Sequence, residues 1–269
     1  MEKLYGIIGE KLGHTYSPEI HKKILEAINI KGQFGVFQVR KDLLIDVVPG
    51  LKALGYNGVT VTIPYKVDIM KYLDEISIEA KNIGAINVVD IKKGKAIGYN
   101  TDYYGFGMTL KHFDIDIQGE EAVILGTGGA SRAVVQYLVD NGIKNIIFVS
   151  RNIEEARKKY PKYEIISYKE LDTIKESKLV VNCTPVGMYP KNEFTPMDKK
   201  YLKKFKAVVD IIYNPLETLF LKEAKEQGLK SVNGMYMLVA QAVRAQEIWN
   251  DIEIPYEVVD KIYEYMIQK

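Results

Sequence analysis

Residues 122–131 read Ala-Val-Ile-Leu-Gly-Thr-Gly-Gly-Ala-Ser, a short apolar run followed at once by three glycines in four residues. The run predicts a buried strand of a parallel sheet, and the helical pattern of Ala130–Asp140 begins where the glycines end. Glycines in such a turn let the backbone approach a pyrophosphate, and the start of the helix offers free N–H groups and partial positive charge. The stretch therefore predicts a dinucleotide-binding turn. Ser131 takes the place of the third glycine, and a purely structural turn is the alternative.

The end of the next strand indicates which dinucleotide binds. That strand, Ile146–Val149, is followed by Ser150-Arg151-Asn152. An NAD site usually has an acidic residue there to hold the ribose diol, and this sequence has none. A guanidinium at this place pairs well with a 2′-phosphate. Arg151 therefore favours NADP as the cofactor, with a solvated surface arginine as the alternative.

The alternation of strands and helices extends over most of the chain and predicts two α/β units. In the second unit the strands are near-continuous apolar runs, which predict a doubly wound parallel sheet. These strands are Ala122–Leu125, Ile146–Val149, Leu179–Asn182 and Ala207–Ile212, with helices at Ala130–Asp140, Asn152–Lys159 and Thr218–Gln227. In the first unit a mainly parallel sheet with one added hairpin is expected. Its strands are Leu4–Ile8, Phe34–Gln38, Val59–Ile63 and the hairpin pair Ile86–Val89 and Ala96–Tyr99, with helices at Pro18–Ile30 and Lys41–Leu54.

The boundary between the two units is expected within Asn100–Gly119. Later in the chain, Gly234–Trp249 is apolar almost all round, which is typical of a helix buried between layers or domains. Such a helix could carry the chain back to the first unit. The predicted domains are therefore residues 1–101, completed by C-terminal helices within 236–269, and residues 102–235.

The charge balance and the cysteine content exclude several kinds of partner. Lys and Arg number 37 against 35 Asp and Glu, so the formal net charge is only +2. Nucleic acid and anionic membranes call for a basic patch or stripe, which this balance does not favour. With three histidines and a single cysteine, Cys183, neither a zinc site nor an internal disulfide is expected. The composition predicts a cytoplasmic enzyme that binds small molecules and no metal.

Several polar residues of the first unit stand where an ordinary scaffold has no need of them. Thr15 and Ser17 precede a predicted helix, where hydroxyls suit a small carboxylate; Ser17 as a simple N-cap is the alternative. Lys66 follows a strand and is expected to open a helix, a poor place for a cation, and an exposed lysine is the alternative. Asp102 opens the helix after the hairpin, which capping would also explain. Gln241 lies in the apolar helix, where a buried amide needs partners from the core or from a ligand.

Taken together, these segments resemble the shikimate dehydrogenase family through nearly the whole chain and in the family's order. The matching segments are Thr15–Pro18, Val61–Lys66, Gly84–Asn87, Asn100–Asp102, Gly126–Arg132, Ser150–Asn152, Asn182–Met188, Asp210–Pro215 with Thr218, and Gly234–Gln241. The resemblance implies an N-terminal α/β substrate domain, a Rossmann-type NADP-binding domain and a cleft between them. It also implies reversible, NADPH-dependent reduction of 3-dehydroshikimate to shikimate, a step of aromatic amino acid biosynthesis through the shikimate pathway.

The resemblance further implies a role for each site residue. Lys66 and Asp102 match the catalytic pair beside the reacting oxygen. The substrate carboxylate would be bound by Thr15, Ser17 and Tyr213, and the ring hydroxyls by Thr62, Asn87 and Gln241. The pyrophosphate would be bound at the turn formed by Gly126, Thr127, Gly128, Gly129 and Ala130. The 2′-phosphate would be bound by Ser150, Arg151 and Asn152, and the nicotinamide side would be lined by Thr184 and Gly234. Cys183 matches a variable small residue, which we interpret as packing.

Some positions depart from the family pattern. Thr15 and Thr60 stand where serine and asparagine are usual, and Tyr103 stands where glycine is usual. Glu154 and Glu155 stand where a second arginine for the 2′-phosphate is often found. These changes leave the predicted chemistry intact, but they bear on substrate choice and on the strength of the preference for NADP.

Two other functions compete with this hypothesis. The first is a quinate/shikimate dehydrogenase or a related cyclitol-acid oxidoreductase. The second is a non-catalytic dinucleotide-sensing protein, which would keep the glycine-rich turn but has no need of both Lys66 and Asp102. Either a monomer or a homodimer is expected.

Overall fold

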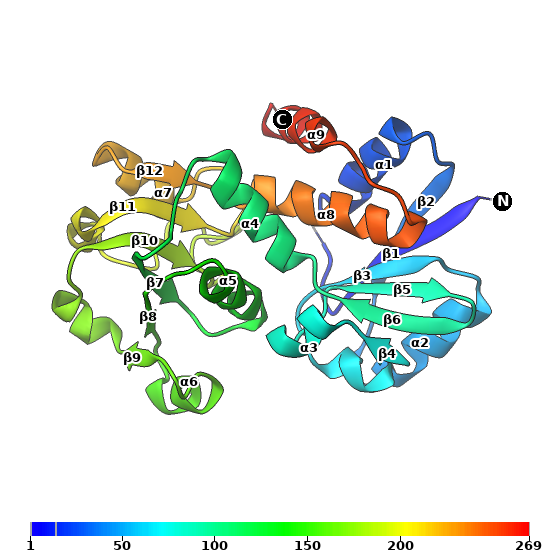
Figure 1. Cartoon of the computed structure of the whole chain (residues 1–269), viewed down its shortest axis with the longest axis horizontal. Coiled ribbons are helices and arrows are strands. Elements are labelled where there is room, and N and C mark those ends of the chain that lie inside the picture. The colour runs from blue at the N-terminus through cyan, green and yellow to red at the C-terminus, as the bar shows by residue number, and fades with distance from the viewer. Residues whose placement is uncertain (1, 14, 269) are drawn as a thin grey trace. The chain divides into compact units, whose positions relative to one another are not determined.

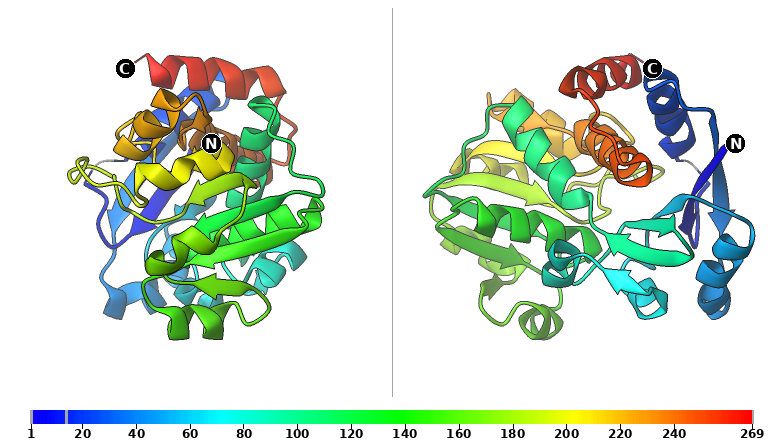
Figure 2. Two further views of the ribbon diagram at one scale, coloured as in Figure 1. Left: turned by 90° about the vertical axis from the view of Figure 1, so that its left-hand side faces the viewer. Right: turned by 45° about the vertical axis from the view of Figure 1, so that its right-hand side comes forward.

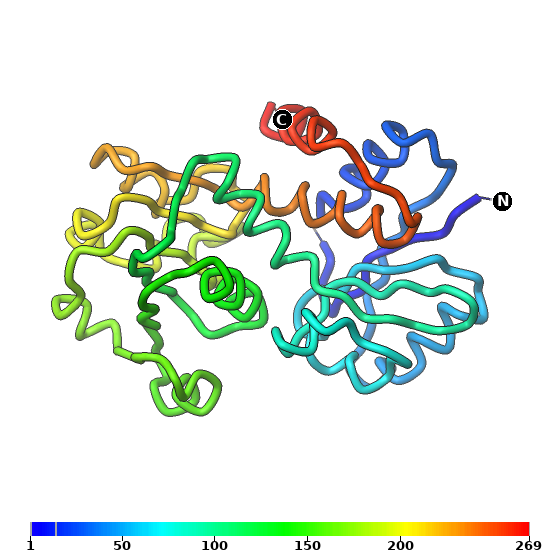
Figure 3. Tube along the Cα trace, viewed as in Figure 1, coloured from blue at the N-terminus to red at the C-terminus, as the bar shows by residue number. Residues whose placement is uncertain are grey.

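The computed structural model describes residues 2–13 and 15–268. The chain forms two compact units, unit 1 with Met1–Gly105 and Val239–Lys269, and unit 2 with Phe106–Leu238 (Figure 1). Helix α4 (Asp102–His112) leads from unit 1 into unit 2, and helix α8 (Met235–Asn250) leads back, as the continuous trace in Figure 3 shows. The domain boundaries expected from the sequence lie at the start of these two helices. The boundaries of the two compact units lie inside the helices.

Unit 1 is built on a six-stranded sheet with the order β2-β1-β3-β5-β6-β4. The strands are β1 (Lys3–Gly9), β2 (Gly32–Gln38), β3 (Gly58–Val61), β4 (Glu75–Ile76), β5 (Val88–Lys92) and β6 (Lys95–Tyr99). Strand β1 pairs in parallel with β2 and β3, and β4 pairs in parallel with β6. Strand β5 is antiparallel to both of its neighbours, so the sheet is mainly parallel with one antiparallel strand, which agrees with the expectation of a mainly parallel sheet and an added hairpin. The predicted hairpin is confirmed: Lys93 and Gly94 both have positive φ, as a two-residue type I′ turn requires.

The helical segments of unit 1 differ from the prediction at two site residues. They are α1 (Ser17–Ala27), α2 (Leu44–Ala53), α3 (Ile78–Ile83) and α9 (Tyr256–Ile267), with 3-10 turns η1 (Lys41–Leu43) and η2 (Asp68–Tyr72). Ser17 is the first helical residue rather than the N-cap, which is Tyr16 without a side-chain hydrogen bond. Lys66 lies in a turn before η2 and opens no α-helix, because Pro64 and the residues around it form successive turns. The capping alternative for Ser17 and the helix expected at Lys66 were therefore wrong.

Unit 2 has a fully parallel sheet with the order β12-β11-β10-β7-β8-β9. Its strands are β7 (Glu121–Leu125), β8 (Asn145–Val149), β9 (Glu164–Ile166), β10 (Ser177–Asn182), β11 (Phe205–Asp210) and β12 (Lys230–Val232). This is the doubly wound order of dinucleotide-binding folds, with the switch point between β7 and β10. The expected Rossmann-type sheet is confirmed, and Figure 2 shows the twist of its strands. The short strands β9 and β12 were not predicted.

Helices cover both faces of this sheet, which explains its unbroken apolar strands. They are α5 (Gly129–Asp140), α6 (Ile153–Lys159) and α7 (Leu219–Glu226), with 3-10 turns η3 (Tyr168–Thr173) and η4 (Lys199–Lys204). Alternate residues of β7 enter two separate cores: Ala122 and Ile124 pack in the core that contains Val134 of α5. Val123 and Leu125 pack in the other core, which contains helix α7. Because both faces are buried, neither can be polar. In the part of the chain that the structure describes, no helix combines the length and apolar character needed to span a bilayer.

A buried chain of hydrogen bonds fastens helix α8 to the core of unit 1. The Tyr5 hydroxyl donates to Asn250 Oδ1 at 2.9 Å, and Asn250 Nδ2 donates to Gln246 Oε1 at 2.9 Å. Gln246 Nε2 lies 3.0 Å from His21 Nδ1, and because an amide nitrogen only donates, the imidazole nitrogen accepts. His21 is 1% exposed and stacks on Phe34 at a centroid distance of 4.0 Å. Burial lowers the pKa of His21 from 6.5 to about 3, so the ring is neutral in the folded protein.

This buried histidine should make unit 1 sensitive to acid. Below about pH 6.5 the unfolded chain binds a proton at His21 and the folded chain does not, so the free energy of unfolding falls as the pH falls toward 3. Between about pH 7.5 and about pH 5 we expect a loss of about 2 kcal/mol from this residue. The measurement is urea unfolding of wild type and His21→Phe at both pH values. The phenylalanine keeps the stacking and should show the smaller loss; equal losses would contradict the assignment.

Candidate active site

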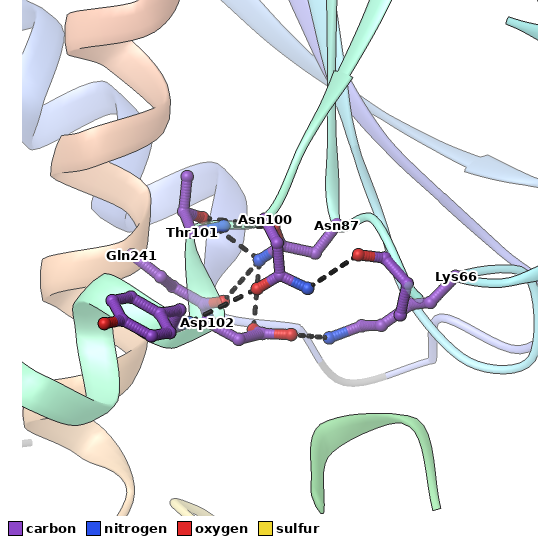
Figure 4. Close-up of polar contacts among 8 residues, drawn as sticks. Lys66, Asn87, Asn100, Thr101, Asp102 and Gln241 are labelled. Carbon is purple, nitrogen blue, oxygen red and sulfur yellow. Dashed lines mark hydrogen bonds and ion pairs between the residues drawn. The ribbon is translucent and has the colours of Figure 1, made fainter. Parts of the chain in front are cut away.

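A buried ion pair stands at the centre of the candidate site in unit 1. Lys66 Nζ lies 2.6 Å from Asp102 Oδ2, and the two side chains are 15% and 4% exposed (Figure 4). Lys66 is held in its turn after β3 because Ile86 N–H donates to its carbonyl at 2.8 Å. Asp102 is the first residue of α4. Charges withdrawn from water in this way persist only with good geometry and further hydrogen bonds.

Asn87 supplies those further hydrogen bonds. Its Nδ2 is 3.0 Å from Asp102 Oδ1, from Gln241 Oε1 and from Thr101 Oγ1. The Asn87 Nδ2 group carries two hydrogens but has three acceptors within reach. In the simplest assignment it donates to Asp102 and Gln241, and the Thr101 hydroxyl donates to Asn87 Oδ1. The Thr101 N–H also donates to Asn87 Oδ1 at 2.6 Å. The amide of Asn87 thus joins the ion pair to helix α8 through Gln241.

The backbone around Asn87 is fixed by the hairpin and its neighbours. Asn87 N–H donates to Tyr99 O at 3.0 Å, and Val61 N–H donates to Asn87 O at 2.7 Å. Asn100 Nδ2 donates to Ala85 O at 2.9 Å, which ties the segment before α4 to the segment before β5. Lys66, Asn87 and Asp102 therefore come from three stretches of sequence that backbone hydrogen bonds hold together.

The other predicted substrate residues are placed separately from this hydrogen-bonded group. Thr15 Oγ1 donates to Ser17 Oγ at 3.1 Å and accepts from Ser17 N–H at 3.2 Å, so the two hydroxyls form a local pair before α1. Thr62 follows β3, half-buried, with its N–H donated to Ile8 O. Tyr213 belongs to unit 2, in the segment after β11, and is half-buried.

The glycine-rich turn of unit 2 has the backbone geometry that its sequence predicts. Gly126 has φ +92°, and a Cβ there would lie 2.6 Å from Thr184 Cγ2, so only glycine fits. Gly128 caps α5, and a Cβ there would meet open space. Ser131, in place of the third glycine, is fully buried; its hydroxyl donates to Gly128 O at 2.7 Å and lies 2.9 Å from the Tyr160 hydroxyl. The turn leaves room for a ligand over Gly128 and the start of α5.

Of the three residues after β8, Ser150 and Asn152 form hydrogen bonds that fix the loop, and Arg151 is exposed to solvent. Ser150 Oγ accepts from Asn152 N–H at 3.2 Å and donates to Asn152 O. The Asn152 side chain caps α6 by accepting from Glu155 N–H at 3.1 Å. Arg151 is exposed, and within the described residues it forms no hydrogen bond or ion pair. Its guanidinium is therefore available to an anionic ligand.

The hydrogen bonds also involve Thr101 and Asp210, to which the sequence gave no individual role. Thr101 donates to Asn87 twice. Asp210 ends β11 beside Asn182 at the end of β10, a residue that the family resemblance places on the nicotinamide side, and Asn182 Nδ2 donates to Asp210 Oδ1 at 3.0 Å. The signal for the second pair was present, because both are polar residues at the carboxyl ends of otherwise apolar strands. Among residues 2–13 and 15–268, no group of three or more His, Cys, Asp or Glu side chains is placed to hold a metal ion.

These features define a class of protein. A doubly wound sheet with a glycine-rich turn is built to bind a dinucleotide, and an ammonium–carboxylate pair can hold and move a proton. Together they describe a dinucleotide-dependent α/β oxidoreductase.

Comparison with known proteins gives the family. Residues 7–89 match the shikimate dehydrogenase substrate binding domain, and residues 108–213 match the shikimate / quinate 5-dehydrogenase model. A shikimate dehydrogenase (NADP(+)) of Clostridium perfringens is 51% identical over 97% of each chain. A solved chorismate mutase/shikimate 5-dehydrogenase fusion protein from Clostridium acetobutylicum aligns with a TM-score of 0.97 at 49% identity, covering 100% of this chain and 98% of that one. Shikimate 5-dehydrogenase of Thermus thermophilus in complex with NADP(H) and shikimate gives a TM-score of 0.88 at 29% identity, over 98% and 99% of the two chains.

The chain belongs to the shikimate dehydrogenase family.

Because the ion pair is buried, the effects of replacing Lys66 and Asp102 on the free energy of unfolding should depend on each other. Lys66→Ala leaves a buried carboxylate without its cation and should cost about 3–5 kcal/mol. Adding Asp102→Asn removes the stranded charge, so the double variant should be more stable than Lys66→Ala alone. Urea unfolding of the four proteins measures the cycle.

The exposed pair of Lys95 and Glu75, 63% and 51% exposed, gives the matched control in the same unit. Lys95→Ala should cost about 0–1 kcal/mol. Additive losses at Lys66 and Asp102 would show that the two side chains do not act as a pair.

Proposed function

We propose that this protein is an enzyme that reversibly reduces 3-dehydroshikimate to shikimate with NADPH. The observation that carries the proposal is the buried pair of Lys66 and Asp102, held by Asn87 in a chain that has a dinucleotide-binding turn. A scaffold or sensor has no use for a desolvated ammonium that is paired with a carboxylate which an amide in turn holds in place.

The residues of unit 2 fit an NADP cofactor. The free space over Gly128 and the N–H groups at the start of α5 suit a pyrophosphate. Ala130 continues this first turn, and Thr127 and Gly129 flank Gly128. Arg151 is exposed at the carboxyl end of β8, where a 2′-phosphate is bound in this fold. Thr184 and Gly234 would line the nicotinamide side.

Lys66 and Asp102 carry the acid–base chemistry. When bound, NADPH supplies a hydride to the ketone carbon of the substrate. Negative charge then develops on the ketone oxygen, and the Lys66 ammonium stabilises it and gives it a proton, which completes the hydroxyl. Asp102 keeps the ammonium in place through Oδ2 while Asn87 occupies Oδ1. In the oxidation of shikimate the same nitrogen accepts the hydroxyl proton.

Unit 1 also contains polar side chains that can bind the hydroxyls and the carboxylate of the substrate. Gln241 accepts from Asn87 through Oε1, so its Nε2 is the group left to donate to a ring hydroxyl. Ser17 receives the Thr15 proton and keeps its own hydroxyl proton for a carboxylate. Thr62 and Asn87 complete the hydroxyl-binding set, and Tyr213 of unit 2 would add a donor to the carboxylate.

The division of labour follows the two units. We assign substrate binding to unit 1 and NADP binding to unit 2, since the residues named above fall in them accordingly, Tyr213 excepted. A cytoplasmic enzyme that acts as a monomer or homodimer remains the expectation; size-exclusion chromatography with light scattering distinguishes the two assemblies.

The direct test of the activity is a comparison of four substrate–cofactor pairs. Shikimate and quinate are each oxidised with NADP and with NAD, following reduced cofactor by absorbance. We expect shikimate with NADP to give the highest kcat/KM and quinate to be roughly 10–200-fold worse, because a pocket that rejects an added hydroxyl only by shape discriminates weakly. Comparable values for the two acids would favour a quinate/shikimate dehydrogenase, and no turnover with any pair would contradict the proposal.

Arg151 should decide the preference between the two cofactors. Arg151→Ala removes a charge-assisted contact to the 2′-phosphate and should weaken NADP by roughly 10–150-fold while NAD changes little. Arg157, exposed on α6, gives a matched control, and Arg157→Ala should alter neither cofactor strongly. Equal losses for NADP and NAD at Arg151 would make that residue structural.

A further inference from the structure

Asp210 is a buried carboxylate that the proposed reaction does not use. It ends β11, beside Asn182 at the end of β10, and both residues are 0% exposed. Three donors reach its two oxygens: Asn182 Nδ2 at 3.0 Å and Ile212 N–H at 3.1 Å on Oδ1, and the Thr218 hydroxyl at 2.8 Å on Oδ2. Within the described residues no Lys or Arg pairs with it. A charge buried on three neutral donors is costly, which indicates a specific task.

Each donor belongs to a different segment at the carboxyl edge of the sheet. Asn182 organises the loop after β10, because its Oδ1 accepts from Thr184 N–H at 3.0 Å and from the Thr184 hydroxyl at 2.6 Å. Its Nδ2 also reaches Val186 O at 3.3 Å. Thr218 is the N-cap of α7 and accepts from Leu221 N–H. One carboxylate thus anchors a loop and a helix start.

The third donor, Ile212 N–H, fixes the segment that leads to Tyr213. Ile212 O accepts in turn from Gly234 N–H at 2.9 Å. A Cβ at Gly234 would lie 2.1 Å from Ile211 O, so the two segments touch through backbone atoms. Asp210 therefore also sets the backbone on which Tyr213 and Gly234 are carried.

The loop after β10 lies against the dinucleotide turn. Cys183 N–H donates to Leu125 O at 2.9 Å, and Thr184 Cγ2 occupies the space that a Cβ on Gly126 would need. Resting on the proposed function, we propose that Asp210 is a positioning residue for the nicotinamide end of the cofactor. It acts through Asn182 on Thr184 and through Ile212 on Tyr213 and Gly234. The adenosine end, bound after β8, does not depend on it.

The carboxylate can be changed without changing its shape. All three donors need an acceptor, which the ionised form supplies; burial raises its pKa to about 7 against the opposing effect of these hydrogen bonds. The titratable group that faces it is the buried thiol of Cys183, whose own pKa is raised by burial. In Asp210→Asn the amide oxygen can still accept from Asn182 and Ile212 N–H, and the amide nitrogen can donate to the Thr218 hydroxyl. The variant therefore keeps the shape of the side chain and the positions of its partners. Asp210→Ala removes all three contacts.

The test separates positioning from general destabilisation. Val208, fully buried in β11 two residues earlier, gives the matched control, because Val208→Ala opens a cavity in the same strand without touching the loops. Three quantities are measured for wild type and the three variants: the fluorescence of bound NADPH, the inhibition constant of 2′,5′-ADP, and the single-turnover rate of hydride transfer.

We expect Asp210→Ala to change the nicotinamide fluorescence and to slow hydride transfer by roughly 10–100-fold, since small misplacements of reacting atoms are that costly. The inhibition constant of 2′,5′-ADP should stay near the wild-type value. Asp210→Asn should recover most of the rate, and Val208→Ala should match wild type in all three.

A parallel loss of 2′,5′-ADP affinity and rate in Asp210→Ala would overturn the proposal, because it would mark a collapse of the whole unit. Unchanged fluorescence and rate would overturn it as well. A wild type that binds NADPH but does not reduce 3-dehydroshikimate would contradict the proposed function instead, and the fluorescence comparison would then decide the role of Asp210.

Discussion

The carboxamide of Asn87 is the constraint on which the site of unit 1 depends. Its two hydrogens and one oxygen are bound to a carboxylate on α4, an amide on α8 and the backbone before α4. An amide is neutral, so it can stand beside Asp102 without competing with Lys66 for the charge. It also leaves one oxygen of Asp102 to the lysine alone. The geometry of the ion pair therefore follows from one buried side chain.

In unit 2 the candidate site depends on backbone geometry more than on charged side chains. The features that we propose bind its ligand are mostly backbone: a glycine with φ +92°, an uncovered turn and the start of α5. Its buried polar network lies at the ends of β10 and β11, where it holds the following loops in place and includes no ion pair among the described residues. In the proposed function, unit 1 places the acid–base pair and unit 2 places the cofactor.

Much of the fold could be predicted because its signals are local. The apolar run before Gly126 and the Lys93-Gly94 turn each determine their structure within a few residues. The short strands β4, β9 and β12 were missed, since two or three residues carry no periodicity. The antiparallel placement of β5 depends on pairing with β3, which lies almost thirty residues earlier and leaves no local mark.

The site was predictable in part and for a different reason. The sequence indicated Lys66 and Asp102 as charges in unusual places and Gln241 as a buried amide in need of partners. The pairing of Lys66 with Asp102 and the role of Asn87 came only from the family resemblance. The alternative of Ser17 as an N-cap was wrong and shows the limit of local rules, because its hydroxyl accepts from Thr15 instead of from the helix. Thr101 lies in the matching segment Asn100–Asp102, but its hydrogen bonds to Asn87 depend on a residue fourteen positions earlier and were not predicted.

In the proposed reaction, Lys66 supplies charge and a proton to the forming alkoxide. The most direct measurement is the turnover rate of Lys66→Ala in the reduction of 3-dehydroshikimate, taken together with the dissociation constant of shikimate for the same variant. We expect kcat to fall by roughly 10²–10⁴-fold with a much smaller change in the dissociation constant of shikimate, because the interaction is strongest in the transition state. Near-normal turnover, or a loss carried mainly by weaker binding, would contradict it.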